Sequence, residues 1–442
     1  MNPTISELGT EESSSVGFQL WRDRNFLSLI SGTFFSVIGD GSYFIILGWF
    51  VLNVTGSEFA LGTTLTFASI PRIIFMLLGG AVADRINKKL ILVLSLWMRA
   101  LILGFFVAVL IGMHGNPALW LVDVVAVIFG TIDAFFYPAN SSVVPSVVPS
   151  KVLDRANSLV QTVQQLSAVL GPLLASGLLW MREYQGMFGS IAVIFAASSV
   201  ILSFLRIRKG EQKLVHQNDE KPFSILNDIW DGIRFVASVR ILVLVMIVTL
   251  GINLLFMGPI NIGIPIYVKS MGWSGSIYGG YESGFGVGAV VGGMLVSSLR
   301  GFRGRFIWLG VLGIVMGIAM SGIGFIKVSW GGIALMGIMG IAISIVDIPL
   351  ITYIQTIVPS DKLGRTMSLL TLMSVGLVPV SYTLTSYILQ QHLIRVSELL
   401  LACGIAIAVL FSSLYLFREF RHIEDHPLWT VKFGSKADDV AG

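Results

Sequence analysis

Long apolar segments separated by short polar ones recur along the whole chain of 442 residues. A helix needs about 20 largely apolar residues to span the hydrocarbon of a bilayer. The segments that meet this requirement are 26–52, 58–83, 90–112, 118–141, 153–181, 187–206, 241–267, 276–299, 305–327, 331–357, 365–390 and 396–417. The pattern therefore predicts an all-α membrane protein with twelve transmembrane helices.

A short sequence motif occurs twice in the chain. Residues 148–159 read VPSKVLDRANSL, and residues 358–369, 210 positions later, read VPSDKLGRTMSL, with seven of twelve positions identical. Because each copy follows one apolar segment and begins another, we expect two pseudo-symmetric six-helix bundles with a substrate cavity between them. The expected divisions are an N-terminal segment (1–25), a first bundle (26–206), a linker (207–240), a second bundle (241–417) and a tail (418–442).

Composition excludes several other classes of protein. Hydrophobic residues make up 55% of the chain and charged residues 12%, which is too little charge to cover a soluble protein of this length. The single cysteine, Cys403, excludes a disulfide framework and a cysteine metal site. We expect no metal, no cofactor, no catalytic residues and no enzymatic activity. Without a phosphate-binding loop, ATP is not expected to supply the energy.

Basic residues predict the orientation, because cytoplasmic loops carry an excess of lysine and arginine. With the N-terminus inside, only Arg182, Lys269, Lys327 and Arg395 fall outside, and Arg72 and Arg99 fall within spans; 23 of the 29 basic residues are then cytoplasmic. We expect both termini in the cytoplasm. The net charge of +4 reflects this bias and does not indicate nucleic-acid binding.

The long loop between the halves begins with a polar stretch typical of a flexible linker. Towards its end, Ile225, Ile229, Ile233 and Val236 recur at helical spacing among charged residues. This spacing predicts an amphipathic helix on the cytoplasmic membrane surface.

The second span ends in GGAVADRINKK, residues 79–89. A tight turn that obeys the positive-inside rule would explain these residues. The motif also resembles the loop between helices 2 and 3 of the major facilitator superfamily, although Asn87 stands where that motif has its middle glycine. On this resemblance the residues of a gating motif are Gly80, Asp84, Arg85, Lys88 and Lys89. The second-half counterpart, residues 292–305, has Ser297 where an acid would stand.

Further motifs are similar to one branch of that superfamily. NVTGSEFALG (53–62), the Pro71–Arg72 pair and FFYPANSSVVPSVVP (135–149) resemble the drug exporters that include macrolide and siderophore exporters. The fifth span contains SAVLGPLLAS (167–176), similar to the glycine–proline element of superfamily antiporters. Its core, Gly171 and Pro172, is present, but the flanking glycines are replaced. The resemblance therefore supports antiport, and the replaced glycines leave this assignment open.

Glycines at every fourth position mark one face of the eighth span. Gly280, Gly284, Gly288 and Gly292 lie within a sequence that also has the G-x-G spacing of a dinucleotide-binding loop. No strand precedes it, so the nucleotide interpretation fails. The spacing predicts close helix packing within the bilayer.

Charged residues inside the predicted spans are the main functional candidates, since a mid-membrane charge costs from about 3 to more than 10 kcal/mol. They are Asp40, Arg72, Arg99, Asp133, Glu282 and Asp347. At about 1.5 Å per helical residue, Asp40 and Arg72 lie at matching heights in neighbouring spans. Arg99 and Asp133 also match. Two ion pairs are therefore expected, with either a structural or a transport role.

Acids on cavity-lining helices could couple a substrate to protons. In the superfamily architecture, spans 1, 4, 7 and 10 line the central cavity, which places Asp40, Asp133 and Asp347 there, beside Asn253 and Asn261. A partly desolvated acid can exchange a proton near neutral pH and can also pair with a cationic substrate. We expect Asp40 to be the principal proton-linked carboxylate, with Asp133 and Asp347 as second choices. Glu282 lies off this set and is either structural or part of an outer gate.

The sequence thus predicts a proton-driven exporter of bulky hydrophobic or cationic drugs such as macrolides, working by alternating access in a bacterial cytoplasmic membrane. Its expected partners are a lipophilic small molecule, protons and the lipid bilayer, and the protein is expected to be a monomer. Three alternatives remain open: export of a siderophore or another metabolite, lysophospholipid transport, and a receptor or scaffold that no longer transports.

Overall fold

The computed structural model describes residues 20–149, 152–181, 183–207, 233–298, 306–425 and 429. Within the helices, the side chains of residues 76–85, 154, 360, 361, 364, 365 and 368 lie outside this description. All regular structure in the described ranges is helical, which confirms the all-α prediction.

Each predicted span contains a helix. In chain order these are α2 (Arg24–Thr55), α3 (Glu58–Arg85), α4 (Lys88–Gly112), α5 (Leu119–Ser142), α6 (Leu153–Leu178), α7 (Tyr184–Ser203), α9 (Arg240–Gly258) with α10 (Ile264–Ser270), α11 (Gly275–Ser298), α12 (Ile307–Ile323), α13 (Ser329–Ile357), α14 (Ser360–Gly376) with α15 (Val378–Gln390), and α16 (Val396–Leu414). In the described residues, nine helical stretches are long and apolar enough to cross a membrane, and α12 is a shorter apolar helix.

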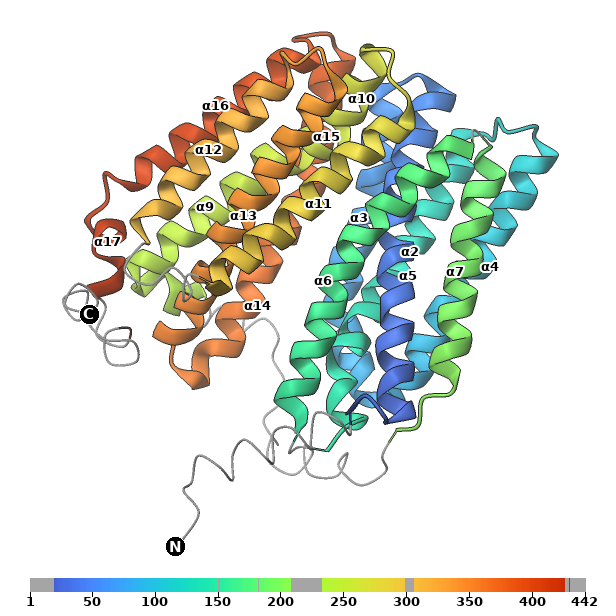
Figure 1. Cartoon of the computed structure of the whole chain (residues 1–442), viewed down its shortest axis with the longest axis horizontal. Helices are drawn as coiled ribbons and strands as arrows, with labels where there is room; N and C mark the ends of the chain where they lie inside the picture. Colours follow the sequence, from blue (N-terminus) through green and yellow to red (C-terminus); the bar gives the residue numbers. More distant parts are fainter. Residues whose placement is uncertain are drawn as a thin grey trace, which may run out of the picture. The chain divides into compact units, whose positions relative to one another are not determined.

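By compactness the chain divides into two units. Unit 1 comprises residues 1–47 and 67–221, and unit 2 comprises residues 48–66 and 222–442. The end of α2 and the start of α3 therefore group with the second unit, although the sequence places residues 48–66 in the first half. Each unit is described separately below (Figure 1).

In unit 1, α4 and α7 run side by side and α4 also packs on α5 (Figure 1). Serine hydroxyls join the helices: Ser199 Oγ on α7 donates to the Val93 carbonyl on α4 at 2.8 Å. Ser198 Oγ donates to the Gly32 carbonyl on α2 at 2.7 Å. Such hydrogen bonds supplement packing in a bilayer, where helix association gains little from the hydrophobic effect.

In unit 1, the start of α2 and the segment after α7 are held together by one side-chain amide. Asn25 Nδ2 donates to the Arg206 carbonyl at 2.5 Å, and the Arg206 backbone N–H donates to Asn25 Oδ1 at 2.6 Å. Asn25 stands at the start of α2, and Arg206 follows the end of α7. This pair, the Asn25–Arg206 clasp, joins residues 181 positions apart.

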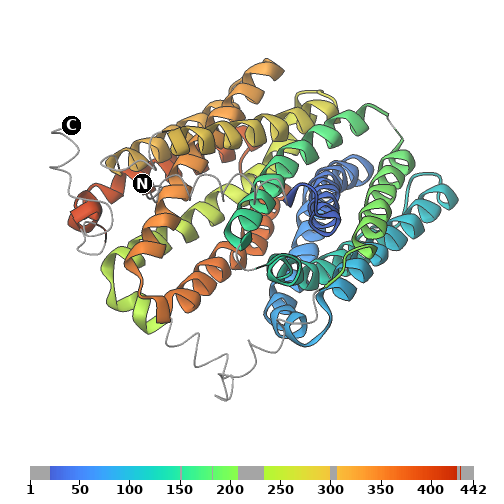
Figure 2. The same cartoon turned by 60° about the horizontal axis from the view of Figure 1, so that its bottom comes forward.

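In unit 2, α11 packs on α13 and α12 packs on α16, as the helices running alongside one another in Figure 2 show. The predicted glycine face of α11 is confirmed. A Cβ on Gly288 would overlap the carbonyl oxygen of Gly337 on α13, and one on Gly292 would lie 2.6 Å from the Ile341 carbonyl oxygen. The two backbones therefore meet directly.

Two predicted spans are interrupted. Between α9 and α10, residues 259–263 form a π-helical turn. Just before it, Ser381 Oγ accepts from the Gly258 N–H at 2.7 Å and donates to the Leu254 carbonyl at 2.6 Å. In a regular helix the Gly258 N–H would donate directly to the Leu254 carbonyl, and the Ser381 hydroxyl contacts both groups. A side chain inserted into the hydrogen-bond ladder in this way is a recognised cause of a kink. The second interruption, at Leu377 between α14 and α15, precedes Pro379, which has no N–H to donate.

Several predicted features lie outside the described residues. The N-terminal segment is described only from residue 20, and the tail only to residue 425 and at residue 429. Of the predicted amphipathic helix, residues 233–238 are helical, and the part before residue 233 is not described.

Candidate functional site

Arg99 is the centre of a charged cluster in the interior of unit 1. It lies on α4 with a fully buried side chain. Its Nη1 is 2.6 Å from Asp40 Oδ1 on α2, and its Nη2 is 2.7 Å from Asp133 Oδ1 on α5. One guanidinium thus joins three helices. A planar fork of donors makes arginine suited to binding two carboxylates at once.

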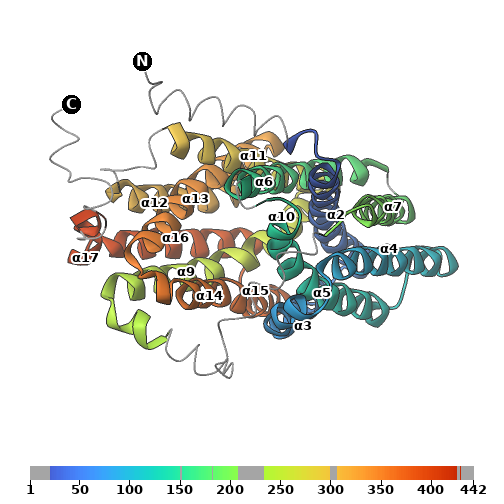
Figure 3. The ribbon, with the colours of Figure 1, turned by 90° about the horizontal axis from the view of Figure 1, so that it is seen from below.

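A fourth charge extends the cluster. Arg72 on α3 places Nε 3.0 Å from Asp133 Oδ2, so that Asp133 accepts from two guanidinium groups. Figure 3 shows α3 next to α5 when the molecule is viewed from below. The expected Arg99–Asp133 pair is confirmed. The expected Asp40–Arg72 pair is wrong: Arg72 bridges to Asp133, and Asp40 pairs with Arg99. We call these four residues the Arg99 network.

Aromatic rings surround the buried guanidinium. The Arg99 Cζ atom lies 4.7 Å from the ring centroid of Phe136, 5.2 Å from that of Phe129 and 5.6 Å from that of Phe195. A cation near an aromatic face is stabilised by roughly 0.5–2 kcal/mol, most when it is desolvated. Arg99 Nε has no hydrogen-bond partner among the described residues, so its cation depends on the two carboxylates and these rings.

Asp40 lies between two glycines that let neighbouring helices approach. A Cβ on Gly39 would stand 2.8 Å from a ring carbon of Phe195. One on Gly41 would stand 3.5 Å from Cα of Gly171. The sequence element Gly171–Pro172 therefore packs on α2 beside Asp40. Ser42 Oγ strengthens this contact by donating to the Gly171 carbonyl at 2.9 Å.

The two carboxylates of the network are held differently. Both oxygens of Asp133 face guanidinium groups, and its side chain is 9% exposed. Asp40 uses one oxygen to pair with Arg99, and its side chain is 24% exposed. Protonation of Asp40 removes one charged contact, whereas protonation of Asp133 disturbs two. Asp40 therefore has one guanidinium contact fewer than Asp133 and is the more exposed of the two carboxylates.

The acids predicted in unit 2 stand alone. Asp347 on α13 is exposed and has no hydrogen-bond or ion-pair partner in the part of the chain that the structure describes. Glu282 on α11 has one oxygen, Oε1, that is buried without a hydrogen-bond partner among the same residues. Neither acid belongs to the Arg99 network, which lies entirely in unit 1.

The two predicted asparagines are satisfied by their own helical segment. Asn253 Nδ2 donates to the Thr249 carbonyl at 2.8 Å, and Asn261 Nδ2 donates to the Met257 carbonyl at 2.9 Å. Asn261 occupies the middle of the π-helical turn. Each amide retains its oxygen as an acceptor, so both can still bind a ligand that donates a hydrogen bond.

Comparison with known proteins identifies the family. The sequence profile of the Major Facilitator Superfamily matches residues 29–382. The chain belongs to the Major Facilitator Superfamily. It is therefore a multi-pass membrane protein of a family of transporters rather than of enzymes, which confirms the resemblance seen in the loop and span motifs.

Relatives within the superfamily include drug exporters. The multidrug efflux pump Tap of Mycolicibacterium fortuitum is 24% identical, with 75% of this chain and 81% of Tap covered. Macrolide efflux protein A of Streptococcus pyogenes is 22% identical, with 78% of this chain and 84% of that protein covered. The uncharacterised superfamily transporter YfiS of Bacillus subtilis is 24% identical, with 77% and 81% covered.

Solved structures share the superfamily fold. The nucleoside transporter NupG superposes with a TM-score of 0.69 at 12% identity, covering 89% of this chain and 99% of NupG. A bacterial homologue of the human lysosomal transporter Spinster gives a TM-score of 0.63 at 14% identity, covering 90% and 96%. At these identities the likeness concerns the fold alone.

The superfamily loop motif is described in part. The side chains of Gly80, Asp84 and Arg85 lie outside the described residues. Asn87, where the motif has a glycine, caps α4 by accepting from the Lys89 N–H at 3.0 Å. Lys88 Nζ donates to the Ser142 carbonyl at the end of α5 at 2.9 Å. The substitution thus retains a helix cap, and the lysine stabilises a helix C-terminus.

The aromatic residues around Arg99 were missed by the sequence analysis. Phe129 and Phe136 lie four and three positions from Asp133 on α5, and Phe195 lies on α7. The spacing on α5 offered a signal, since residues three or four apart share a helix face. In a chain with 28 phenylalanines, this spacing alone does not separate a charge-binding ring from a lipid-facing one.

Proposed function

We propose that this superfamily transporter exports bulky, hydrophobic, cationic compounds of the macrolide-like drug class in exchange for protons. Two relatives are named for macrolide and multidrug efflux. The observation that carries the proposal is the Arg99 network, with Asp40 as its partly exposed carboxylate. Buried ion pairs often cost stability relative to apolar packing, so a connected cluster of four charges, two of them buried, favours a functional role over a purely structural one.

The network supplies a simple basis for exchange. With Asp40 ionised, two arginines and two aspartates carry no net charge; with Asp40 protonated, the network carries one net positive charge. A cationic substrate near Asp40 is therefore favoured when the acid is ionised and repelled when it is protonated. One carboxylate that takes the proton and the cation in turn couples their movements, because loading one requires release of the other.

A non-transporting receptor or scaffold has no need of these charges. Removing one partner of a buried pair costs about 3–5 kcal/mol, while apolar replacement of the whole pair is often neutral or stabilising. We further propose that the protein resides in a bacterial cytoplasmic membrane with both termini inside. Epitope tags at residues 150, 360 and 442 of intact cells should all be inaccessible from outside, and labelling of any one overturns this orientation.

The exchange is tested in proteoliposomes with an imposed pH gradient. Replacing Asp40 with Asn keeps the size of the side chain and removes its titration. We expect Asp40→Asn to abolish uphill, proton-driven efflux and to weaken equilibrium binding of a cationic substrate, because the network then always carries one net positive charge. Glu183→Gln, at an exposed acid before α7, is the matched control and should pump normally. If Asp40→Asn pumps uphill with unchanged pH dependence, the assignment to Asp40 is wrong, and Asp133 and Asp347 become the candidates.

The substrate class is tested by growth of a pump-deficient bacterial host that expresses the chain. We expect raised resistance to macrolides and lipophilic cations, lost on addition of a protonophore. Susceptibility unchanged across the panel would overturn drug export. The same host would then be tested for export of siderophores and for transport of lysophospholipid.

A further inference from the structure

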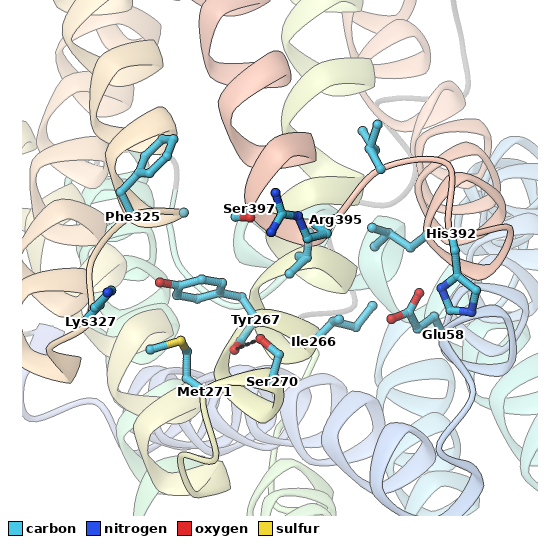
Figure 4. Close-up of a pocket in the computed structure, with 14 residues that line it drawn as sticks. Glu58, Ile266, Tyr267, Ser270, Met271, Phe325, Lys327, His392, Arg395 and Ser397 are labelled. Carbon is cyan, nitrogen blue, oxygen red and sulfur yellow. Dashed lines mark hydrogen bonds between the residues drawn. The ribbon is translucent and has the colours of Figure 1, made fainter.

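A pocket separate from the Arg99 network lies in unit 2. It has a volume of about 470 Å³ and is bounded by the start of α3, the end of α10, the segment after α12 and the turn from α15 to α16. Figure 4 shows its polar and charged lining: Glu58, Tyr267, Ser270, Lys327, His392 and Arg395. The walls between them are apolar, with Ile266, Met271 and Phe325 among them.

The basic residues of this pocket are unusual for the external side of a membrane protein. In the proposed orientation the pocket is external, where only four basic residues of the chain are expected. Two of those four, Lys327 and Arg395, line this one pocket. Since basic residues are scarce on the outer side of membrane proteins, their meeting in one cavity calls for an explanation other than topology.

The basic side chains differ in what they have available for a ligand. Arg395 is held by Glu398, with Nη2 and Nε at 2.6 and 2.9 Å from Oε1. Lys327 makes no hydrogen bond or ion pair with any described residue. Arg395 is therefore largely neutralised by its neighbour, and Lys327 supplies the free positive charge.

The negative charge of the pocket is also unsatisfied. Glu58 Oε2 is buried and has no hydrogen-bond partner among the described residues. His392 lies beside Glu58, while Lys327 lies at the opposite side of the view in Figure 4. The pocket therefore presents a free cation and an incompletely satisfied carboxylate at separate places. A ligand with only positive charge would meet Lys327, and one with only negative charge would meet Glu58.

We propose that this pocket binds a zwitterionic group, with a phosphate at Lys327 and an ammonium at Glu58. An ammonium supplies the donors that Glu58 Oε2 lacks, and a phosphate accepts from the lysine ammonium. The apolar wall between the two ends receives methylene groups. The chemistry is that of phosphoethanolamine, which occurs both as a lipid headgroup and in water-soluble form.

The test uses the purified full chain in a maltoside detergent, which carries no charge. Isothermal titration measures binding of lysophosphatidylethanolamine, of water-soluble glycerophosphoethanolamine and of the anionic lysophosphatidylglycerol. We expect saturable binding of a zwitterionic probe, weakened roughly tenfold or more by Glu58→Gln and by Lys327→Met, since each removes one charge-assisted contact. Binding of the lipid alone identifies a membrane lipid as the ligand, and binding of both probes identifies a soluble zwitterion as sufficient.

Comparison of the zwitterionic probes with the anionic lysophosphatidylglycerol distinguishes binding in this pocket from non-specific binding of lipid. Lysophosphatidylglycerol should bind more weakly, and Glu58→Gln should not weaken it further. Glu183→Gln is the control for loss of an exposed acid, and an unchanged melting temperature shows that each variant is folded. No saturable binding of either zwitterion, or binding insensitive to both substitutions, overturns the proposal. Because Asp40 lies in unit 1, such a failure leaves the proton-exchange assay unaffected.

Discussion

The two units differ in how the charged side chains on their helices are paired. Unit 1 collects two arginines and two aspartates into one connected network enclosed by aromatic rings. Unit 2 contains two acids, Glu282 and Asp347, for which the structure shows no charged partner within the described residues. Its helices α11 and α13 instead meet at backbone distance through glycines.

This difference shows two ways of holding helices together in a bilayer. In unit 1, directional charge-assisted hydrogen bonds fix α2, α3, α4 and α5 relative to one another, and a change of protonation alters them. In unit 2, van der Waals contact between backbones fixes α11 against α13, and no proton affects that contact. Contacts that respond to protonation therefore lie in unit 1, whereas the contact between α11 and α13 in unit 2 does not respond to pH.

The largest expected effect comes from removing the centre of the network. Arg99→Gln leaves Asp40 without its guanidinium and deprives Asp133 of one of two, so we expect unfolding to become easier by about 3–5 kcal/mol. Reversible unfolding by dodecyl sulfate in mixed micelles measures this. The control is Arg240→Gln, which breaks an exposed pair with Glu419 at 3.2 Å and should cost about 0–1 kcal/mol. Equal costs would contradict the central role of Arg99.

The next effect separates the two aspartates. Asp133→Asn weakens contacts to two guanidinium groups, whereas Asp40→Asn weakens contact to one. A hydrogen bond to a charged group contributes about 1.5–3 kcal/mol, so Asp133→Asn should be the more destabilising by about that amount. The same unfolding assay at neutral pH measures the difference. A larger cost for Asp40→Asn would show that the order of the two acids is wrong.

A smaller effect is expected from the glycine contact of unit 2. Gly288→Ala places a methyl group against the Gly337 carbonyl and should cost about 1–3 kcal/mol by overpacking. Gly293→Ala on the same helix meets Ile348 Cδ1 at an ordinary 3.7 Å and serves as the matched control. Unlike the network variants, Gly288→Ala should cost the same at every pH. A pH-dependent cost would contradict packing as the cause.

The smallest effect on stability is expected at Asp347. Because this acid has no partner within the described residues, Asp347→Asn removes no contact and should change the unfolding free energy by less than about 0.5 kcal/mol. Under the proposed function, which assigns the exchange to Asp40, proton-driven efflux by Asp347→Asn should also be retained. A stability loss similar to that of Asp133→Asn would reveal a charged partner and remove the contrast between the units.

The positions of the helices could be predicted from the sequence. Spanning a bilayer sets a minimum length of apolar residues, so hydropathy locates each span, although some helix ends differ by several residues, as at α14, which begins at Ser360 rather than at 365. The predicted span 118–141 matches α5 (Leu119–Ser142), and 331–357 matches α13 (Ser329–Ile357). The glycine face of α11 could also be predicted, because four-residue spacing fixes which residues share a helix face.

The pair of Arg99 with Asp133 could be predicted from the sequence, but the other partners within the network could not. The sequence sets the height of a residue along its helix, but the rotation of each helix is set by packing, such as the contact of Gly41 with Gly171. Height along the helices paired each acid with a single arginine, Asp40 with Arg72 and Asp133 with Arg99. The structure instead gives Arg99 two acids. Ser381 shows the same limit, since no pattern in α15 indicates that its hydroxyl enters the hydrogen-bond ladder of α9.

The Asn25–Arg206 clasp has a consequence for how unit 1 can be built. Both of its hydrogen bonds use backbone groups of Arg206, so the start of α2 is fixed to the residues that follow α7. Protein units with adjacent ends tolerate circular permutation. We therefore expect that the helices α2 to α7 can be synthesised in another order, with residues 25 and 206 joined by a short bridge and new ends opened between α4 and α5. The fold of these helices therefore does not depend on which of them comes first in the chain.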